Sequence, residues 1–418
     1  MPAVLRFLLQ VACVAASLSC IACSDSSETA ASPAGPAVAP QSGAGPIPVA
    51  VLTPAGTATQ QPIPIPAPPT VPVKGYFVID FTTGAVLAAS NENERLEPAS
   101  LTKLMSAYGV FHALKAGRIK LDDMVKISAH ARDQDGSRMF VEVGTTVSVE
   151  NLIQGMIVQS GNDATVALAE HVAGSEPVFV DQMNQYAQQL GMSGSHFENA
   201  PGMPGAQHYV TARDIGILSA ALIRDFPEYY KYYSQREFTW NKITQPNRNG
   251  LLDRDPTVDG LKTGHTDSAG YCLVSSAKRD GMRIVSVVMG AQSIRAREDA
   301  SFALINYGFR FFETKQLYVA NKPVLPVRVW KGQAEQVELA PNRDVVVTIP
   351  RGQEATLAGA VDVVNPLVAP LEKGTAAGKL RVTRGTEVVG SYDLYPLADV
   401  PSAGFFSRIW DDVKLWME

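Results

Sequence analysis

The spacing of apolar residues predicts a mixed α/β region over residues 74–314. Two apolar runs, "GYFVID" and "AVLAAS", flank a turn at Thr82 to Gly84 and predict paired strands. From Ser100 to Gly117 apolar residues recur at helical spacing, and the final glycine suits a helix end. "VENLIQGMIVQ" and "DATVALAEHVAG" predict two further helices, with "SGN" at the break between them. "YCLVSSAKRDGMRIVSVVMG" predicts a hairpin turning at Asp280-Gly281, and "REDASFALINYGFRFFET" predicts the helix that closes this region.

The pattern changes after residue 314. Residues 315–399 hold five short Val-rich runs, "VLPVRVW", "DVVVTIP", "AVDVV", "KLRVT" and "EVVGSYDL", separated by turn residues. This pattern predicts a small all-β domain, a sandwich. Residues 400–418 end in "GFFSRIWDDVKLWME", whose apolar residues fall on one helical stripe with charges opposite. We expect this helix to lie in a membrane interface. The alternative is a helix packed against the β domain.

The N-terminal residues carry a different pattern. In residues 1–23, Arg6 precedes the apolar run "FLLQVACVAASL", which is too short to span a bilayer and predicts a secretory signal peptide. A lipidated Cys20 or Cys23 is the alternative, although neither cysteine has a leucine three positions before it. Residues 24–73 are rich in Ala, Pro, Gly, Ser and Thr and predict a disordered tether, because such a stretch cannot bury a core.

Composition narrows the classes of function. The 418 residues are 46% hydrophobic with a formal net charge of -5, which gives no basic surplus for nucleic acid. Beyond the predicted signal only Cys272 remains, so there is no internal disulfide framework, and an exported protein of this kind suits a bacterial envelope. Cys272 is expected to be a buried strand residue. The six histidines contain no i, i+4 pair, so we expect no metal, and no cofactor is indicated.

One candidate for chemistry is the pair Ser100 and Lys103 in "PASLTKLM". Residues three apart share a helix face, so the hydroxyl and the amine can meet. Ser275 and Lys278 have the same spacing but lie in a predicted strand, where an odd offset puts side chains on opposite faces. The first pair is therefore the candidate.

Two short motifs follow this pair along the chain. Ser160-Gly161-Asn162 is the one Ser-x-Asn of the sequence, and Lys262-Thr263-Gly264 is its one Lys-Thr-Gly. Each motif alone is weak evidence. In the order Ser-x-x-Lys, Ser-x-Asn, Lys-Thr-Gly they form the set used by penicillin-recognising acyl-serine enzymes.

Acyl-transfer chemistry suggests a role for each polar group. Ser100 needs a base, and the sequence has no G-x-S-x-G that would indicate a histidine-based triad. Lys103 can serve only as a neutral amine, and burial with a second cation, Lys262, would lower its pKa. Ser160 can pass a proton to the leaving amine.

The remaining motif residues suit substrate binding. Asn162 offers an amide to the substrate backbone, while Lys262 and Thr263 offer a cation and a hydroxyl to a terminal carboxylate. Gly264 would let a substrate lie against the strand as an added β-strand. The backbone N–H groups of Ser100 and His265 are the expected oxyanion donors.

With "QSGNDA", "RNGLL", "VDGLKTGHTDSAGY" and "NYGFRFFET" in order, the chain resembles the low-molecular-mass penicillin-binding proteins, the serine-type D-alanyl-D-alanine carboxypeptidases. The resemblance implies a transpeptidase/β-lactamase-like catalytic domain, then a β-sandwich and an amphipathic helix. It implies Ser100 as acyl-ester nucleophile, Lys103 as proton acceptor and Ser160 as the third catalytic residue. It also places Arg248 beside the active site and Arg297 near the substrate carboxylate.

The same resemblance implies the partners and the location. These are the peptidoglycan stem pentapeptide, β-lactams as inhibitors, and the outer face of the inner membrane, reached from the periplasm through the C-terminal helix.

Three other functions stay open. A class A β-lactamase needs a glutamate for deacylation; Glu237 and Asn241 have the right separation, but Trp240 stands where a leucine is expected. The other two are a non-catalytic wall-binding protein and endopeptidase action.

Overall fold

The computed structural model describes residues 47–49 and 65–417. The predicted signal peptide, Cys20 and Cys23 lie outside this range. Within it, no helix is long and apolar enough to cross a membrane.

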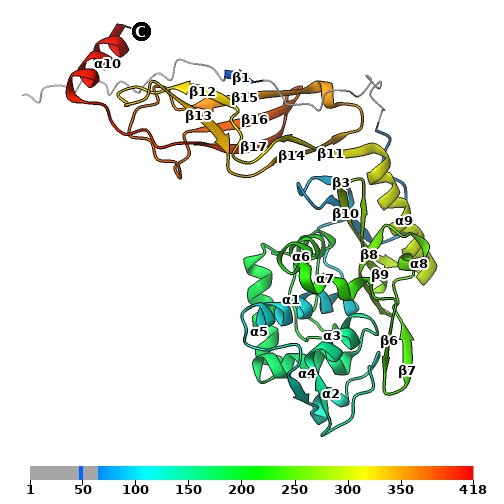
Figure 1. Ribbon diagram of the computed structural model, residues 1–418. Helices are drawn as coiled ribbons and strands as arrows, with labels where there is room; N and C mark the ends of the chain where they lie inside the picture. Colours follow the sequence, from blue (N-terminus) through cyan, green and yellow to red (C-terminus); the bar gives the residue numbers. More distant parts are fainter. Residues whose placement is uncertain (1–46, 50–64, 418) are drawn as a thin grey trace, which may run out of the picture. The chain divides into compact units, whose positions relative to one another are not determined.

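The catalytic region is built on a five-stranded antiparallel sheet with strand order β3-β2-β10-β9-β8 (Figure 1). The strands are β2 (Gly75–Asp80), β3 (Val86–Ser90), β8 (Val258–Thr266), β9 (Gly270–Arg279) and β10 (Met282–Ala291). Both predicted hairpins are confirmed. At the second turn Asp280 and Gly281 both have positive φ, as a tight two-residue hairpin requires.

Helices cover both faces of this sheet. On one face lie η1 (Ala99–Thr102), α1 (Lys103–Lys115), α3 (Val149–Ile157), α4 (Asn162–Ala173), α5 (Glu176–Gln189) and α6 (Ala212–Asp225). On the other lies α9 (Ile294–Phe311). Alternate residues of β2 serve the two cores: Phe77 and Ile79 pack with the helical group, Tyr76 and Val78 with α9. Both faces of the sheet are therefore buried.

Short elements complete this region. They are α2 (Ala129–Arg132), α7 (Pro227–Tyr230), η2 (Lys231–Ser234), α8 (Leu251–Arg254), and the strand pairs β4 (Met124–Lys126) with β5 (Thr146–Ser148) and β6 (Glu237–Trp240) with β7 (Ile243–Pro246). The predicted helix from Ser100 begins as the 3₁₀ turn η1, and the α-helix itself starts at Lys103.

The C-terminal region holds two antiparallel sheets that share one apolar core. A six-stranded sheet has the order β1-β15-β16-β17-β13-β12, and β11 pairs with β14. The strands are β11 (Phe312–Tyr318), β12 (Leu325–Arg328), β13 (Gln336–Pro341), β14 (Val345–Pro350), β15 (Leu357–Val363), β16 (Gly378–Arg384) and β17 (Glu387–Pro396), with the turn η3 (Glu354–Thr356). The all-β prediction is confirmed. Strand β11 begins at Phe312, three residues before the expected start of this domain.

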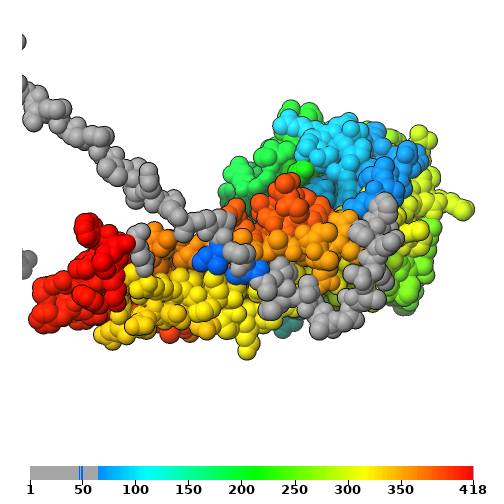
Figure 2. All heavy atoms as spheres, turned by 90° about the horizontal axis from the view of Figure 1, so that it is seen from above, coloured from blue at the N-terminus to red at the C-terminus, as the bar shows by residue number. Residues whose placement is uncertain are grey.

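The expected tether contributes to this sheet at three of its residues. Strand β1 (Ile47–Val49) pairs with β15 antiparallel, and Figure 2 shows it in blue on the surface of the β domain. Val49 also packs against the core. A disordered tether over 24–73 is therefore wrong for these residues, because their backbone groups pair with an open sheet edge. It is also wrong near the end of this stretch, where Val71 and Val73 pack against the core beside α9.

Candidate active site

Ser100 and Lys103 face each other at the start of α1. Ala99 has a left-handed backbone (φ 48°) and begins the 3₁₀ turn that holds Ser100. The Lys103 side chain is buried, and its Nζ donates to Ser100 Oγ at 3.0 Å. Two further acceptors lie within reach: Asn162 Oδ1 at 2.6 Å and the Pro201 carbonyl at 2.7 Å. All three N–H bonds of a charged lysine amine therefore have acceptors.

The surroundings of Lys103 disfavour its charge. Burial, then the positive charge of Arg248, lower the pKa of Lys103 to about 7, although the Asp163 carboxylate acts in the opposite direction. Near neutral pH a large fraction of this lysine is therefore the neutral amine that a proton acceptor must be.

The second motif lies at the break between α3 and α4. Ser160 is buried and has a left-handed backbone, with φ of 61°. Its Oγ accepts from Lys262 Nζ at 2.8 Å. Asn162, the first residue of α4, accepts from Lys103 and donates to the Asp135 carbonyl at 2.5 Å. The two residues of this motif thus contact the lysines of the other two motifs.

The third motif lies on β8, at the edge of the sheet. Lys262 is buried, and it also donates to the Thr263 carbonyl at 3.1 Å. Its pKa is lowered well below the usual value, first by burial and then by Lys103, Arg248 and Arg297. The charges of Lys262, Lys103, Arg248 and Arg297 therefore lie close enough together to repel one another. Such a site favours an anion, because a carboxylate offsets the repulsion among the cations.

Gly264 is required for a reason different from the predicted one. A Cβ at this position would lie 2.9 Å from the Pro98 carbonyl oxygen and 3.2 Å from the Leu101 nitrogen. Strand β8 therefore packs directly against the turn that carries Ser100. The absent side chain lets the first and third motifs approach, and a bound substrate is not needed to explain it.

The other predicted site residues lie around this centre in different ways. The His265 ring is exposed and tilts against Tyr271, with ring centroids 4.0 Å apart. Arg248 is exposed, and its charge acts on both lysines. Arg297 is buried, and its guanidinium donates to the carbonyls of Arg248 (3.2 Å), Cys272 (3.4 Å) and Gly264 (3.5 Å). Arg297 therefore braces the backbone around β8, and its charge also acts on Lys262.

Two features of the site, the Asp163 carboxylate and the Pro201 carbonyl, were not predicted from the sequence. Buried Asp163 accepts hydrogen bonds from the backbone N–H groups of Met139 and Phe140 (both 2.8 Å) and Val141 (3.2 Å), which fixes the loop beside Asn162. Its position in the first turn of α4, directly after Ser-Gly-Asn, was the available signal. The role of the Pro201 carbonyl could not be predicted, because every residue has a backbone carbonyl and the sequence does not mark which one accepts a hydrogen bond.

Both regions of the chain are similar to known proteins. Residues 62–293 match a family model described as D-alanyl-D-alanine carboxypeptidase, and residues 312–402 match the C-terminal domain of penicillin-binding protein 5. The chain belongs to the D-alanyl-D-alanine carboxypeptidase family. Family members named D-alanyl-D-alanine carboxypeptidase DacA from Haemophilus influenzae and DacC from Escherichia coli are 44% and 42% identical to it. These matches cover 82% and 83% of this chain and 89% of each relative.

Solved structures of family members agree. Penicillin-binding protein 5 from Haemophilus influenzae superposes with a TM-score of 0.77 at 43% identity, over 80% of this chain and 99% of that one. Penicillin-binding protein D2 from Listeria monocytogenes, solved in an ampicillin-bound form, gives a TM-score of 0.54 at 31% identity. That match covers 57% of this chain and 98% of the Listeria protein. The expected family and the mixed α/β plus β-sheet architecture are therefore confirmed.

Proposed function

We propose that this chain is a serine D-alanyl-D-alanine carboxypeptidase that removes the terminal D-alanine from the peptidoglycan pentapeptide. The observation that carries the proposal is the buried Lys103 amine, 3.0 Å from Ser100 Oγ with its pKa lowered to about 7. This geometry supports deprotonation of Ser100 by a neutral amine.

Each step then has a group in place. Ser100 Oγ attacks the carbonyl of the D-Ala–D-Ala bond while its proton passes to Lys103. Lys262 and Thr263 hold the terminal carboxylate, and the N–H groups of Ser100 and His265 receive the oxyanion. Ser160 delivers a proton to the leaving amine and is reprotonated by the Lys103 ammonium. D-alanine departs, and water hydrolyses the ester, which returns a proton to Ser100 Oγ. β-Lactams would acylate Ser100 in the same way.

The alternatives have less support. A class A β-lactamase would need Glu237 at the ester, but Glu237 is an exposed residue of β6, in the hairpin β6–β7. A purely wall-binding protein would not need a lysine amine that is buried against a serine hydroxyl. Endopeptidase action uses the same groups, and we propose carboxypeptidase action because the cationic Lys262 site suits a free terminal carboxylate.

The direct test is incubation with a peptidoglycan pentapeptide and measurement of released D-alanine. We expect release by the full chain and none by Ser100→Ala. A second substrate, with its terminal carboxylate amidated, tests whether Lys262 and Thr263 bind that carboxylate. We expect slower turnover of this substrate because it lacks the negative charge. Equal release by Ser100→Ala and the unaltered chain would refute the proposal.

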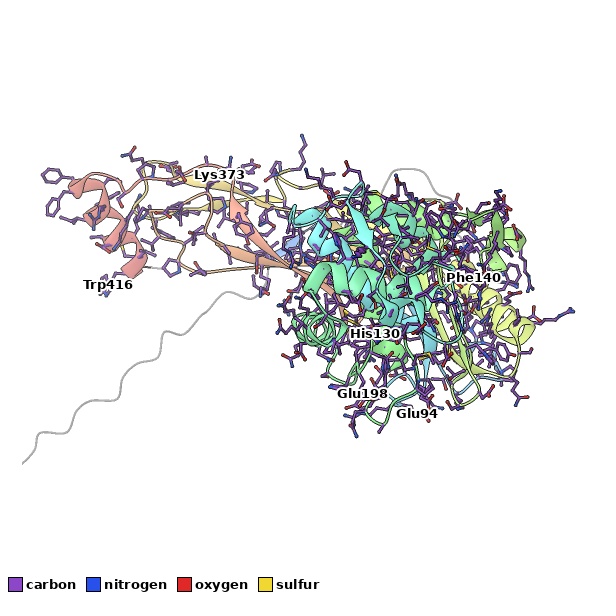
Figure 3. All side chains as sticks on the ribbon, turned by 90° about the horizontal axis from the view of Figure 1, so that it is seen from below. Glu94, His130, Phe140, Glu198, Lys373 and Trp416 are labelled. Atoms are coloured by element: carbon purple, nitrogen blue, oxygen red, sulfur yellow. The ribbon has the colours of Figure 1, made fainter. Side chains whose placement is uncertain are left out.

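We also propose that the enzyme works in the periplasm, held to the outer face of the inner membrane by α10 (Phe405–Met417). All the large apolar residues of this helix except the partly buried Leu415 are exposed: Phe405, Phe406, Ile409, Trp410, Val413, Trp416 and Met417. Figure 3 shows Trp416 at the end of α10, away from the strands of the β domain, and its side chain is 88% exposed. Aromatic residues on such a stripe suit the interface of a bilayer.

Two acidic residues on the side of α10 opposite the apolar stripe contact the β domain. Asp411 accepts from the backbone N–H of Lys331 at 2.7 Å, and Asp412 forms an ion pair with the Lys331 ammonium. The polar side of the helix therefore faces the β domain, which leaves the apolar side free for lipid.

Sedimentation with vesicles of phosphatidylethanolamine and phosphatidylglycerol tests the anchor. We expect the mature chain to bind, and Trp410→Ser/Trp416→Ser to bind at least about tenfold less, because interfacial affinity depends on buried apolar area. Arg408→Ser is the matched control on the same helix. If the double variant binds like the unaltered protein, α10 is not the anchor.

A further inference from the structure

A buried histidine outside the three motifs is connected to the active site by a continuous chain of hydrogen bonds. His208 is 2% exposed, and its Nε2 lies 2.9 Å from the hydroxyl of Thr102, the residue directly before Lys103. Its Nδ1 accepts from the Glu198 backbone N–H and lies 3.2 Å from Asn199 Nδ2. Since Nδ1 is the acceptor, the ring proton is on Nε2 and is donated to Thr102. This tautomer ties the start of α1 to Asn199.

Asn199 in turn shapes the loop that reaches Lys103. Its Oδ1 accepts from the backbone N–H groups of Gly202 and Met203, both at 2.8 Å, and its Nδ2 donates to the Met203 carbonyl at 2.9 Å. Pro201 lies inside this turn, so the direction of its carbonyl is set by Asn199. That carbonyl accepts from Lys103 Nζ at 2.7 Å.

The turn is also packed against the nucleophile's own loop. Gly202 has φ of 90°, and a Cβ there would overlap the Ala99 carbonyl, one residue before Ser100. Met203 Sδ lies 3.5 Å from Asn162 Nδ2. A shift of this turn would therefore change the positions of Lys103, Ser100 and Asn162 together.

The Pro201 carbonyl matters because of how a neutral amine uses its valences. A neutral lysine has two N–H bonds and one lone pair, and the lone pair must point at the serine hydroxyl to take its proton. Around Lys103 Nζ, two acceptors other than Ser100 are present: Asn162 Oδ1 and the Pro201 carbonyl. When these take the two N–H bonds, the lone pair is left for Ser100.

We infer that His208 is a positioning residue for acyl transfer: through Asn199 it fixes the Pro201 carbonyl that orients the Lys103 lone pair toward Ser100. The inference rests on the proposed function, in which Lys103 is the proton acceptor. His208 itself stays neutral in this role, since burial lowers its pKa to about 4.

Two substitutions in the full chain separate the two ring nitrogens. His208→Asn keeps an acceptor on the atom where Nδ1 was, whereas His208→Gln keeps a donor near Nε2 and loses that acceptor. The rate of acylation by a fluorescent penicillin is measured from pH 5 to 10, with the melting temperature of each variant. We expect His208→Gln to acylate about 10- to 100-fold more slowly, because small misplacements of reacting groups cost that much. His208→Asn should stay within about threefold of the unaltered chain.

The midpoint of the pH profile of acylation is a second measurement, and a simple loss of packing would not shift it. A carbonyl that accepts from the ammonium favours its charged form, so freeing Pro201 should lower the pKa of Lys103 and shift the rise in rate to lower pH. The charges of Arg248, Asp163 and Lys262 around Lys103 are unchanged in these variants. His112→Gln, at a partly buried histidine farther along α1, is the matched control and should keep the midpoint and the rate.

A second pair of variants keeps the test decisive if His208→Gln does not fold. Asn199→Ala should slow acylation to a similar extent, and Thr102→Val, which keeps the shape of the side chain, should do so more weakly. Combining His208→Gln with Asn199→Ala should cost no more than Asn199→Ala alone, because both act through one turn. Normal rates and midpoints in Asn199→Ala and Thr102→Val, with Lys103→Arg inactive, would overturn the role of His208 alone. Normal acylation by Lys103→Arg would overturn the proposed function and this inference together.

Discussion

At the residue scale, the charge state of Lys103 decides whether this amine can accept the Ser100 proton. Arg248 is the strongest charge that lowers the pKa of this lysine, after burial itself. Arg248→Gln should therefore raise the pKa of Lys103, so that less neutral amine is present at pH 7. We expect acylation to slow about three- to tenfold at pH 7 and to recover at higher pH. The measurement is the pH profile of penicillin acylation, with Arg236→Gln, an exposed arginine of the same region, as control. An unchanged midpoint would show that Arg248 does not act on Lys103.

Lys103→Arg tests the proton acceptor itself. Arginine stays protonated at any ordinary pH, so it keeps the charge but cannot take the serine proton. We expect acylation to fall by about 10²- to 10⁴-fold, the usual contribution of a general base. The rate constant with a fluorescent penicillin measures it, and circular dichroism checks the fold. If the arginine variant acylates normally, the base lies elsewhere.

The sequence could predict the side chains of the site but not what holds them. Ser100, Lys103 and Ser160 were predicted because their residue types and spacing carry the chemistry. The Pro201 carbonyl and the link from His208 could not be predicted, because they depend on a loop about 100 positions from Lys103 in the chain. Gly264 was predicted as a site residue, but its close packing against the turn that carries Ser100 was not predicted.

At the element scale, α1, α3, α4, α9 and the two hairpins of the catalytic region follow from periodicity. Helices α5 and α6 were not predicted. β11 and β13 were missed because "FETKQLY" and "QVELAP" lack a run of β-branched residues. β1 was missed because Ile47–Val49 lies in a Pro-rich stretch. Its pairing depends on a partner strand more than 300 residues away, which no local pattern reports.

Strand β1 can be displaced by one substitution. A Cβ at Gly359 would lie 2.9 Å from Val49 Cγ2, so Gly359→Val should release β1 from β15. We expect faster hydrogen exchange over Leu357–Val363 and a loss of stability of about 1 kcal/mol or less, since few hydrogen bonds are involved. Ala358→Val on the exposed side of the same strand is the control. Unchanged exchange in Gly359→Val would mean that β1 does not hold this edge.

At the scale of the whole molecule, the catalytic chemistry lies within the first region, although hydrogen bonds join it to the β domain. Buried Asp80 accepts from the hydroxyls of Thr314 and Thr348, the latter at 3.0 Å. The Listeria protein nonetheless matches only 57% of this chain while 98% of its own length is covered. Ending the chain after Phe311 should therefore leave penicillin acylation within about threefold and lower the melting temperature, because distant sites act independently. A folded truncated protein that fails to acylate would show that the β domain shapes the site.

Locating the acyl group tests directly whether Ser100 is the nucleophile. The full chain is incubated with benzylpenicillin, digested, and mapped by mass spectrometry. We expect one adduct, on the peptide that contains Ser100, and no adduct in Ser100→Ala. An adduct on Ser160 or Ser275, or an adduct that persists in Ser100→Ala, would contradict this expectation.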